Sequence, residues 1–332
     1  MKKLFVSMLA VAALVSCSKE QTVSLDKGEL IGFNSFVENS TRAAANEVTD
    51  PSYSTSDKGV ALTQFNVYGA VNGVNIFGGN LVEKTADYGT AWKLNGDKQY
   101  WINGADYEFV AVVDGNKTVK DSENNDVVIT STTRNASGIP TAITYNSDGA
   151  TDLLCARVVR EDNTDTSVVP FSFTHLLSKV KFSVINETTA DATNYRIVLT
   201  EAKITDALAS NTYNVGTSSA WASVDTTDNT KDFTLENLTV NSAATQYHST
   251  ELLLLPGVNV GVTVNASVQA KDTRDVWTEV STMSKTFVNV LGEGTLVANH
   301  AYHFQVKLGI GQEIKFTATE MSEWTDESAI VK

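Results

Sequence analysis

Residues 302–308 read Tyr302-His303-Phe304-Gln305-Val306-Lys307-Leu308, and this stretch decides the fold class of the 332-residue chain. Its apolar side chains occupy every second position, and polar or charged side chains occupy the positions between them. Successive side chains of a β-strand point to opposite faces of a sheet, so the alternation predicts a strand with one buried face. Val180, Phe182 and Val184 repeat the pattern earlier in the chain.

Turn signals divide the first half of the chain into further short strands. Asn-Gly and Asp-Gly pairs favour tight hairpins because both central residues must take a positive φ. Five such pairs recur here: Asn72-Gly73, Asn95-Gly96, Asn103-Gly104, Asp114-Gly115 and Asp148-Gly149. Between them lie the candidate strands Gln64–Val71, Asp106–Val113 and Asp126–Thr132. No long stretch shows the helical period, so the sequence predicts an all-β protein.

A polar segment divides the chain into two halves. Arg160–Ser167 has no apolar periodicity, and strong strand signals flank it on both sides. The length of the chain suits two domains of about 100–200 residues each. We therefore expect one domain at residues 43–165 and a second at residues 166–332.

Composition argues against several classes of function. The formal net charge of −14 disfavours nucleic acid and anionic membrane surfaces as partners. The chain has no nucleophile elbow, phosphate-binding loop or zinc-ligand spacing, so we expect no catalytic residue, no metal and no cofactor. Cys155 lies in an apolar run and His175 in a strand-like motif, so both are interpreted as structural residues. Trp92 and Trp101 are interpreted as core aromatics rather than a sugar-binding platform.

The amino terminus carries the signals of an exported lipoprotein. Lys2 and Lys3 precede the apolar run Leu4–Val15, and Leu14-Val15-Ser16-Cys17 reads as a lipobox. A permanent membrane helix needs about 20 apolar residues, so the run is too short to be one. We predict a signal peptide at residues 1–16 and lipid attachment at Cys17. The alternative is an ordinary secretory signal with an incidental cysteine.

A leader at residues 17–42 follows, and it is polar except for one island at residues 30–37. In this island Ile31, Phe33 and Val37 share one face of a strand. A flexible tether is one interpretation, but a tether has little use for such side chains, which favours the first strand of the fold. Arg42 and Ala43 come next, a basic residue before small ones, and they form a candidate protease site.

These motifs, in their order, resemble the fimbrillin family, the subunits of type V pili of Bacteroidia, over nearly the whole chain. After the lipobox, the Ile-x-Phe strand and Arg42, the motifs are Gln99–Ala111, Pro170–Val184, Leu252–Gly257 and Tyr302–Val306. The resemblance implies two tandem β-sandwich domains with transthyretin-like Greek-key topology. It also implies an outer-membrane lipoprotein precursor that ends in a cell-surface fimbrium.

The resemblance further implies that an Arg-specific protease removes the leader and its strand, here at Arg42. A sandwich that lacks a strand exposes unpaired backbone groups and an open core, which a strand of the next subunit can fill. Residues 313–332 form the candidate donor strand. Its inward side chains and further anchors are Ile314, Phe316, Ala318, Met321 and Trp324. Equally open is that this segment is the last strand of its own domain.

Two main functions therefore remain open on the sequence. The first is a non-enzymatic fimbrial subunit that supports adhesion, with other fimbrial subunits and an Arg-specific protease as partners. The second is a surface protein that keeps its lipid anchor and binds a glycan or a host protein. A secreted hydrolase is a third interpretation, which turnover lost on mutation of a carboxylate pair would support.

Overall fold

The structure is a computed structural model that describes residues 28–37, 62, 64–84, 92–113, 129–188, 193–235, 238–240, 246–247 and 251–321. For residues 36–37, 129–131, 238 and 246–247 the description covers the backbone alone. Within these ranges the chain forms twenty-one β-strands and no helix, which confirms the predicted all-β class. Accordingly, none of these residues belongs to a helix long and apolar enough to cross a membrane.

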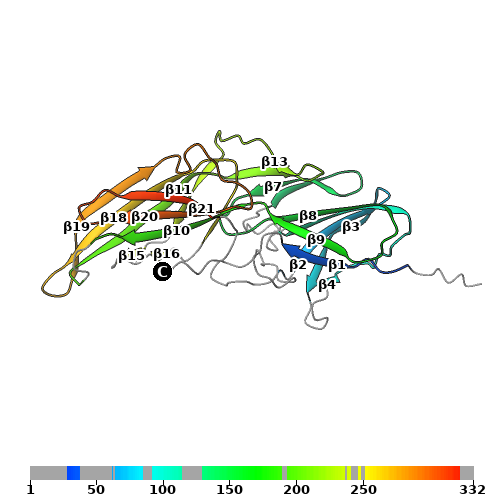
Figure 1. Cartoon of the computed structure of the whole chain (residues 1–332), viewed down its shortest axis with the longest axis horizontal. Helices are drawn as coiled ribbons and strands as arrows, with labels where there is room; N and C mark the ends of the chain where they lie inside the picture. The colour runs from blue at the N-terminus through cyan, green and yellow to red at the C-terminus, as the bar shows by residue number, and fades with distance from the viewer. Residues whose placement is uncertain are drawn as a thin grey trace, which may run out of the picture.

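A seven-stranded sheet forms most of the amino-terminal half, in the order β1-β9-β8-β5-β2-β3-β4 (Figure 1). Its strands are β1 (Phe33–Val37), β2 (Gln64–Val71), β3 (Val74–Lys84), β4 (Trp92–Leu94), β5 (Ala105–Val113), β8 (Leu154–Asn163) and β9 (Val169–His175). The pairing of β1 with β9 is parallel, and the other pairings in the sheet are antiparallel. The sheet curls until its two edges, β1 and β4, lie near each other.

The predicted hairpin at Asn72 and Gly73 is present. These two residues have φ values of 46° and 76° and link β2 to β3, as a type I′ turn requires. Gly104 and Gly149 also have positive φ, but Asn103 and Asp148 do not. Those two pairs therefore form other kinds of turn. The predicted strands at 64–71 and 106–113 correspond to β2 and β5.

A four-stranded sheet packs beside the first and draws on both halves of the sequence. Its order is β13-β12-β7-β6, with β6 (Ile129–Arg134), β7 (Pro140–Asn146), β12 (Ser210–Asn214) and β13 (Ala220–Trp221). The strand β12 follows almost directly from β11, so the chain returns from the second half to pair with β7. The predicted strand at 126–132 corresponds in part to β6.

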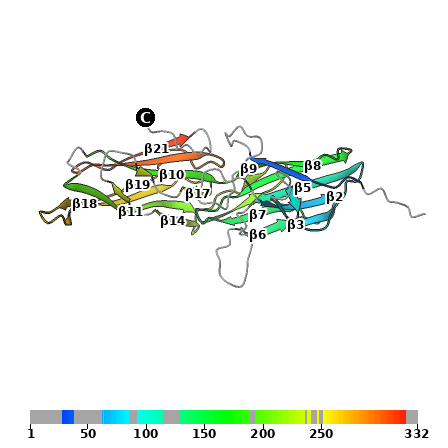
Figure 2. The same ribbon diagram turned by 90° about the horizontal axis from the view of Figure 1, so that it is seen from below.

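Two five-stranded sheets form the carboxyl-terminal half (Figures 1 and 2). One contains β10 (Ser178–Asn186), β16 (Gln246–Tyr247), β17 (Leu252–Leu254), β20 (Ala301–Leu308) and β21 (Lys315–Met321). The other contains β11 (Tyr195–Leu208), β14 (Thr230–Leu235), β15 (Leu238–Val240), β18 (Gly261–Lys271) and β19 (Trp277–Phe287). The two alternating stretches of the sequence analysis are β10 and β20, which pair in parallel with Phe182 opposite Phe304.

The polar segment that the sequence analysis chose as the boundary between two domains connects two strands of one sheet. The expected boundary between residues 165 and 166 falls in the connection from β8 to β9, and both strands belong to the seven-stranded sheet. The connection is polar because it is an exposed turn. Asn163 Oδ1 accepts a hydrogen bond from the Asp165 amide at 3.2 Å, and Asp165 Oδ1 accepts one from the Ser167 amide at 2.8 Å. An exposed turn and a linker between domains are both polar, so composition alone does not distinguish them. Leu176 and Leu177 connect β9 to β10, the first strand of the carboxyl-terminal half.

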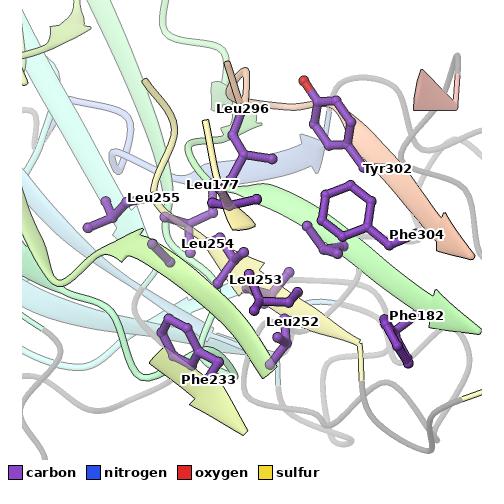
Figure 3. Packing of buried hydrophobic residues seen from close by; sticks show 14 of the residues in the cluster. Leu177, Phe182, Phe233, Leu252, Leu253, Leu254, Leu255, Leu296, Tyr302 and Phe304 are labelled. Atoms are coloured by element: carbon purple, nitrogen blue, oxygen red, sulfur yellow. The ribbon is translucent and has the colours of Figure 1, made fainter. Parts of the chain in front are cut away.

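Among the residues that the structure describes, two hydrophobic clusters stabilise the fold. The first lies inside the curled seven-stranded sheet and includes Phe65, Phe109 and Phe171. The second begins on the opposite face of that sheet, with Val110 beside Phe109, and continues into the carboxyl-terminal half. Figure 3 shows this continuation, where the following side chains gather: Leu177, Phe182, Phe233, Leu252, Leu253, Leu254, Leu255, Leu296, Tyr302 and Phe304.

Candidate functional site

The first strand, β1, occupies an edge of the seven-stranded sheet. Its five residues pair in parallel with residues 169–173 of β9. The segment before it is also held by backbone hydrogen bonds. The Ile31 amide donates to the Gln99 carbonyl at 2.9 Å, and the Trp101 amide donates to the Glu29 carbonyl at 2.9 Å. Residues 29–37 therefore lie between β9 on one side and residues 99–101 on the other.

The inward side chains of this segment belong to the first hydrophobic cluster. Ile31 is 3% exposed and Phe33 is 6% exposed. The Phe33 ring stacks on Phe171 at 5.8 Å between ring centroids. It also meets three rings edge-on, those of Phe65, Phe77 and Phe109, at 6.4, 5.6 and 6.2 Å. The predicted first strand thus supplies the aromatic side chain on which strands β2, β3, β5 and β9 converge.

The strand β9 depends on β1 for most of its pairing. Its ladder with β8 consists of two residue pairs near its end, Leu154 with His175 and Cys155 with Thr174. Its remaining pairing is the five-residue parallel ladder with β1. Loss of β1 would leave the backbone of residues 169–173 without a strand partner, and unpaired strand edges accept added strands readily.

One inward position of β1 is a poor fit to its surroundings. Ser35 is 4% exposed, and its hydroxyl has no hydrogen-bond partner among the residues that the structure describes. Its amide donates to Asn34 Oδ1 at 2.8 Å. A buried hydroxyl without a partner costs free energy that an apolar side chain of similar size would not. The sequence analysis did not single out Ser35, although its place on the same strand face as Phe33 was a signal that could have identified it.

The candidate donor strand pairs within the chain in this structure. The strand β21 forms an antiparallel edge strand on β20. Ile314 is 5% exposed, and the Phe316 ring lies 5.3 Å from that of Phe287 and 5.6 Å from that of Phe304. Ala318 and Met321 are half-buried, so the inward alternation expected of this segment is present. The arrangement is that of a last strand closing its own sheet, the alternative left open by the sequence.

Four of the predicted site residues, Cys17, Arg42, Ala43 and Trp324, lie outside the residues that the structure describes, and Val37 is described in its backbone alone. Lipid attachment at Cys17, cleavage after Arg42 and the role of Trp324 in the donor strand therefore stay predictions.

The structural interpretations of other polar and aromatic residues agree with the structure. Cys155 is buried, and burial raises the pKa of its thiol to about 12. His175 is buried and contacts the Asp152 carboxylate through Nδ1. Trp101 is 5% exposed, and Trp92 packs against Phe65 with ring centroids 5.0 Å apart. In the described part of the chain, no cluster of three or more metal-ligating side chains occurs.

The sequence analysis also missed the partner of the first strand. The predicted boundary assigned residues 169–173 to the second domain, but they pair with β1 in the first. The alternation of Val169, Phe171 and Phe173 marks them as a strand with one buried face. Nothing in that alternation says which strand lies beside it, because pairing is set by contacts far apart in the chain.

Comparison with known proteins gives the chain a family. The model of the fimbrillin-like family matches residues 37–324. A search of curated protein sequences finds no significant match.

Several solved structures with a similar fold come from Bacteroides species. A fimbrial protein from Bacteroides vulgatus has a TM-score of 0.57 and 14% identity, over 90% of this chain and 100% of that one. A proposed cell adhesion protein from Bacteroides uniformis has a TM-score of 0.51 and 16% identity, over 89% and 99% of the two chains. Another from Bacteroides ovatus has a TM-score of 0.50 and 14% identity, over 90% and 99%. At such identities the likeness concerns the fold.

Proposed function

Since this chain belongs to the fimbrillin-like family, we propose that it is a structural subunit of a surface fimbrium, assembled by strand exchange after cleavage at Arg42. The observation that supports this most is the position of β1. It precedes Arg42 in the sequence, yet Phe33 fills the centre of the first hydrophobic cluster. Cleavage there would sever from the chain a strand on which the fold depends.

Cleavage after Arg42 would weaken the binding of β1 to its site without changing any contact that β1 makes there. In the intact chain β1 binds its site intramolecularly, at a high effective concentration. After cleavage the same association becomes bimolecular and loses translational and rotational freedom, which costs several kcal/mol. The leader strand would then compete with a strand from another subunit for the edge of β9 and the pocket of Phe33. Main-chain pairing and alternate side chains would hold the incoming strand.

The export route belongs to the same proposal. Residues 1–16 would serve as the signal peptide, and Cys17 would carry the lipid of an outer-membrane precursor. An Arg-specific protease would release residues 17–42 and leave Ala43 as the new amino terminus. The partners would be other fimbrial subunits, and the final location would be the cell surface. The fold that this chain shares with a fimbrial protein and with proposed cell adhesion proteins supports a role in adhesion rather than catalysis.

The lipid-anchored glycan-binding alternative gains no support from the described residues. An exposed aromatic cluster near Trp92 or Trp101 would favour this alternative. Trp101 is 5% exposed, and Trp92 packs against Phe65.

Substitution of the cleavage site tests the proposal. Arg42→Ala should give a folded monomer that an Arg-specific protease does not convert into fibres visible by electron microscopy. Arg274→Ala is the matched control, because the Arg274 side chain is 84% exposed in the turn between β18 and β19, and this variant should assemble normally. Fibres from Arg42→Ala that match those of the unmodified chain would refute cleavage at this position.

A further inference from the structure

The loop between β7 and β8, residues 147–153, lies where the two halves of the molecule meet, and we call it the joint loop. By sequence it belongs to the amino-terminal half, yet elements of the carboxyl-terminal half bind its backbone. The Ser147 amide donates to the Ala209 carbonyl, between β11 and β12, at 2.9 Å. The Ser147 carbonyl accepts a hydrogen bond from Lys231 Nζ, on β14, at 2.7 Å. One residue of the joint loop is therefore bound to two elements of the other half.

Gly149 brings the joint loop directly against the carboxyl-terminal half. Its carbonyl accepts a hydrogen bond from the Leu253 amide at 2.9 Å, in an isolated antiparallel bridge to β17. Its φ is 78°, and an added Cβ would lie 2.7 Å from the ring of Phe233 and 3.3 Å from the Leu252 side chain. These two side chains lie beside each other in the second hydrophobic cluster (Figure 3). Glycine is needed here because the loop backbone packs closely on β14 and β17.

We propose that the joint loop fixes the angle between the two halves, so that the whole molecule moves as one rigid body. Domains of one chain move relative to each other unless the interface between them is large and hydrophobic. Here specific contacts of one loop supplement the hydrophobic packing. The proposal concerns the uncleaved chain and does not depend on the proposed function.

The joint loop is braced internally, so it cannot absorb movement between the halves. Asp148 Oδ1 accepts hydrogen bonds from the amides of Ala150 and Thr151 at 2.9 and 2.7 Å, and Asp148 Oδ2 accepts one from the Thr151 hydroxyl at 2.6 Å. The buried Tyr145 hydroxyl donates to the Thr151 carbonyl. Burial, followed by the charges of Asp148 and Asp152, raises the pKa of Tyr145 well above its ordinary 10.0, so this hydroxyl keeps the proton that it donates.

A buried carboxylate and imidazole tie the end of the joint loop to the connection between the halves. Asp152 and His175 are 4% and 3% exposed, and the carboxylate contacts Nδ1 of the imidazole. Beside this pair the Leu176 amide donates to the Leu153 carbonyl at 2.9 Å. The Leu176 carbonyl accepts a hydrogen bond from Trp221 Nε1 at 2.8 Å. The joint loop, the end of β9 and β13 are thus bound together where the chain passes from one half to the other.

The shared four-stranded sheet is a second attachment between the halves, which lie end to end in both views (Figures 1 and 2). In this sheet β12 pairs with β7 over five residues, from Ser210 opposite Asn146 to Asn214 opposite Ala142. The second hydrophobic cluster continues from Ile143 of β7 into the carboxyl-terminal half. A change of angle at the joint loop would have to strain this ladder and this packing as well.

Two glycine variants test the joint loop. Gly149→Ala adds the Cβ that would meet the Phe233 ring, which is 7% exposed and cannot move into solvent. Gly104→Ala is the matched control, because Gly104 has a similar φ of 73° but no atom lies within 4 Å of its added Cβ. Both variants carry the strain of a side chain at positive φ. Only Gly149→Ala also pushes the joint loop away from the carboxyl-terminal half.

Spin labels report the angle between the halves in the full chain. Val74, at the start of β3, is 65% exposed, and Val280, in β19, is 57% exposed, so each half has one accessible position. Cysteines placed there as V74C and V280C are labelled in a chain that carries Cys17→Ser. The remaining thiol, Cys155, is buried and should stay unlabelled. Double electron–electron resonance then measures the distribution of distances between the two labels.

The inference predicts one narrow distribution for the labelled parent, and the same distribution for Gly104→Ala. Gly149→Ala should broaden the distribution or shift its mean, while circular dichroism shows that the strands remain. A broad distribution in the parent would overturn the inference. An unchanged distribution in folded Gly149→Ala, or an equal change in both variants, would also overturn it.

A second variant decides the question if Gly149→Ala does not fold. Lys231→Met removes the hydrogen bond to the Ser147 carbonyl and keeps an unbranched side chain beside the Phe233 ring, over which Lys231 Nζ lies at 4.8 Å. A distribution broader than that of the parent would support the inference. A distribution identical to that of the parent would overturn it.

Discussion

Phe33 should contribute more to the stability of the amino-terminal half than any other described residue of the leader. Replacing it by alanine removes a ring that is 6% exposed and that lies within 6.4 Å of four other ring centroids. The remaining rings come from four different strands, so they cannot all move to fill the space. We therefore predict that Phe33→Ala destabilises the amino-terminal half of the uncleaved chain.

The size of the effect follows from comparable core substitutions. Truncation of a buried phenylalanine to alanine costs about 3–5 kcal/mol, made up of lost transfer free energy and the cavity that remains. Because β1 is an edge strand, we expect the lower end, about 3 kcal/mol. This corresponds to a rise of about 10²-fold in the equilibrium constant for opening, since 1.4 kcal/mol is a factor of ten.

Native-state hydrogen exchange measured by mass spectrometry separates the two halves of the chain. Peptides from β2 and β5, which contact Phe33, should exchange faster in Phe33→Ala. Peptides from β18, in the carboxyl-terminal half, should not change. Leu30→Ala is the control, because Leu30 is 48% exposed and its truncation should change stability by less than about 0.5 kcal/mol.

An effect on β2 and β5 below about 1 kcal/mol would refute the reasoning. Equal destabilisation of β18 would also refute it, because it would mean that the Phe33 pocket does not belong to the first cluster alone.

Three further predictions concern other parts of the structure. Ser35→Ala should stabilise the uncleaved amino-terminal half by about 1 kcal/mol, because it removes a buried hydroxyl that has no hydrogen-bond partner among the described residues. Urea unfolding measures this gain, and the absence of a gain would contradict the prediction. In a chain with Cys17→Ser, a thiol reagent at pH 8 should label Cys155 only after unfolding, because burial raises the pKa of this thiol to about 12. Rapid labelling of the folded chain would contradict the burial of Cys155. Hydrogen bonds from Lys315 and Lys307 lower the pKa of Glu187 from its ordinary 4.5, so the bonds that join β21 to Glu187 are fully present above pH 4.5 and are lost as the pH falls through the lowered pKa. Hydrogen exchange of β21, corrected for the intrinsic rate, should therefore rise relative to β10 below pH 4.5, and Glu187→Gln should reduce that rise.

Local pattern in the sequence predicts the elements of this fold well. Turn signals located β2 and β5, and alternation located β10 and β20. Alternation also identified Ile31 and Phe33 as buried residues of a first strand. The Asn72-Gly73 turn was predictable because the positive φ of both residues is a local property. Each of these features depends on residues that are neighbours in the chain.

Pairing between distant segments was not predictable in the same way. The parallel ladder of β1 with β9 joins residues more than 130 positions apart, and no local pattern selects the partner. Local composition is also insufficient to place a boundary between domains. An exposed turn within a sheet and a linker between domains are both polar, so the segment near Asp165 was compatible with either.

The candidate site shows the same division. The inward side chains of the first and last strands follow from alternation, but the misfit of Ser35 depends on what surrounds its hydroxyl in three dimensions. The need for glycine at position 28 depends on the carbonyl oxygen of Trp101, 73 residues later. Sequence pattern can therefore name the strands that take part, while structure is needed to say how well each one fits.

The most direct measurement uses the full chain with Cys17→Ser, treated with an Arg-specific protease. The product is run unboiled on a denaturing gel, and its bands are sequenced from the amino terminus. The account predicts a ladder of oligomers whose subunits begin at Ala43. A folded chain that is not cut after Arg42, or that is cut there and stays monomeric, would contradict the claim that removal of the first strand creates the assembly site.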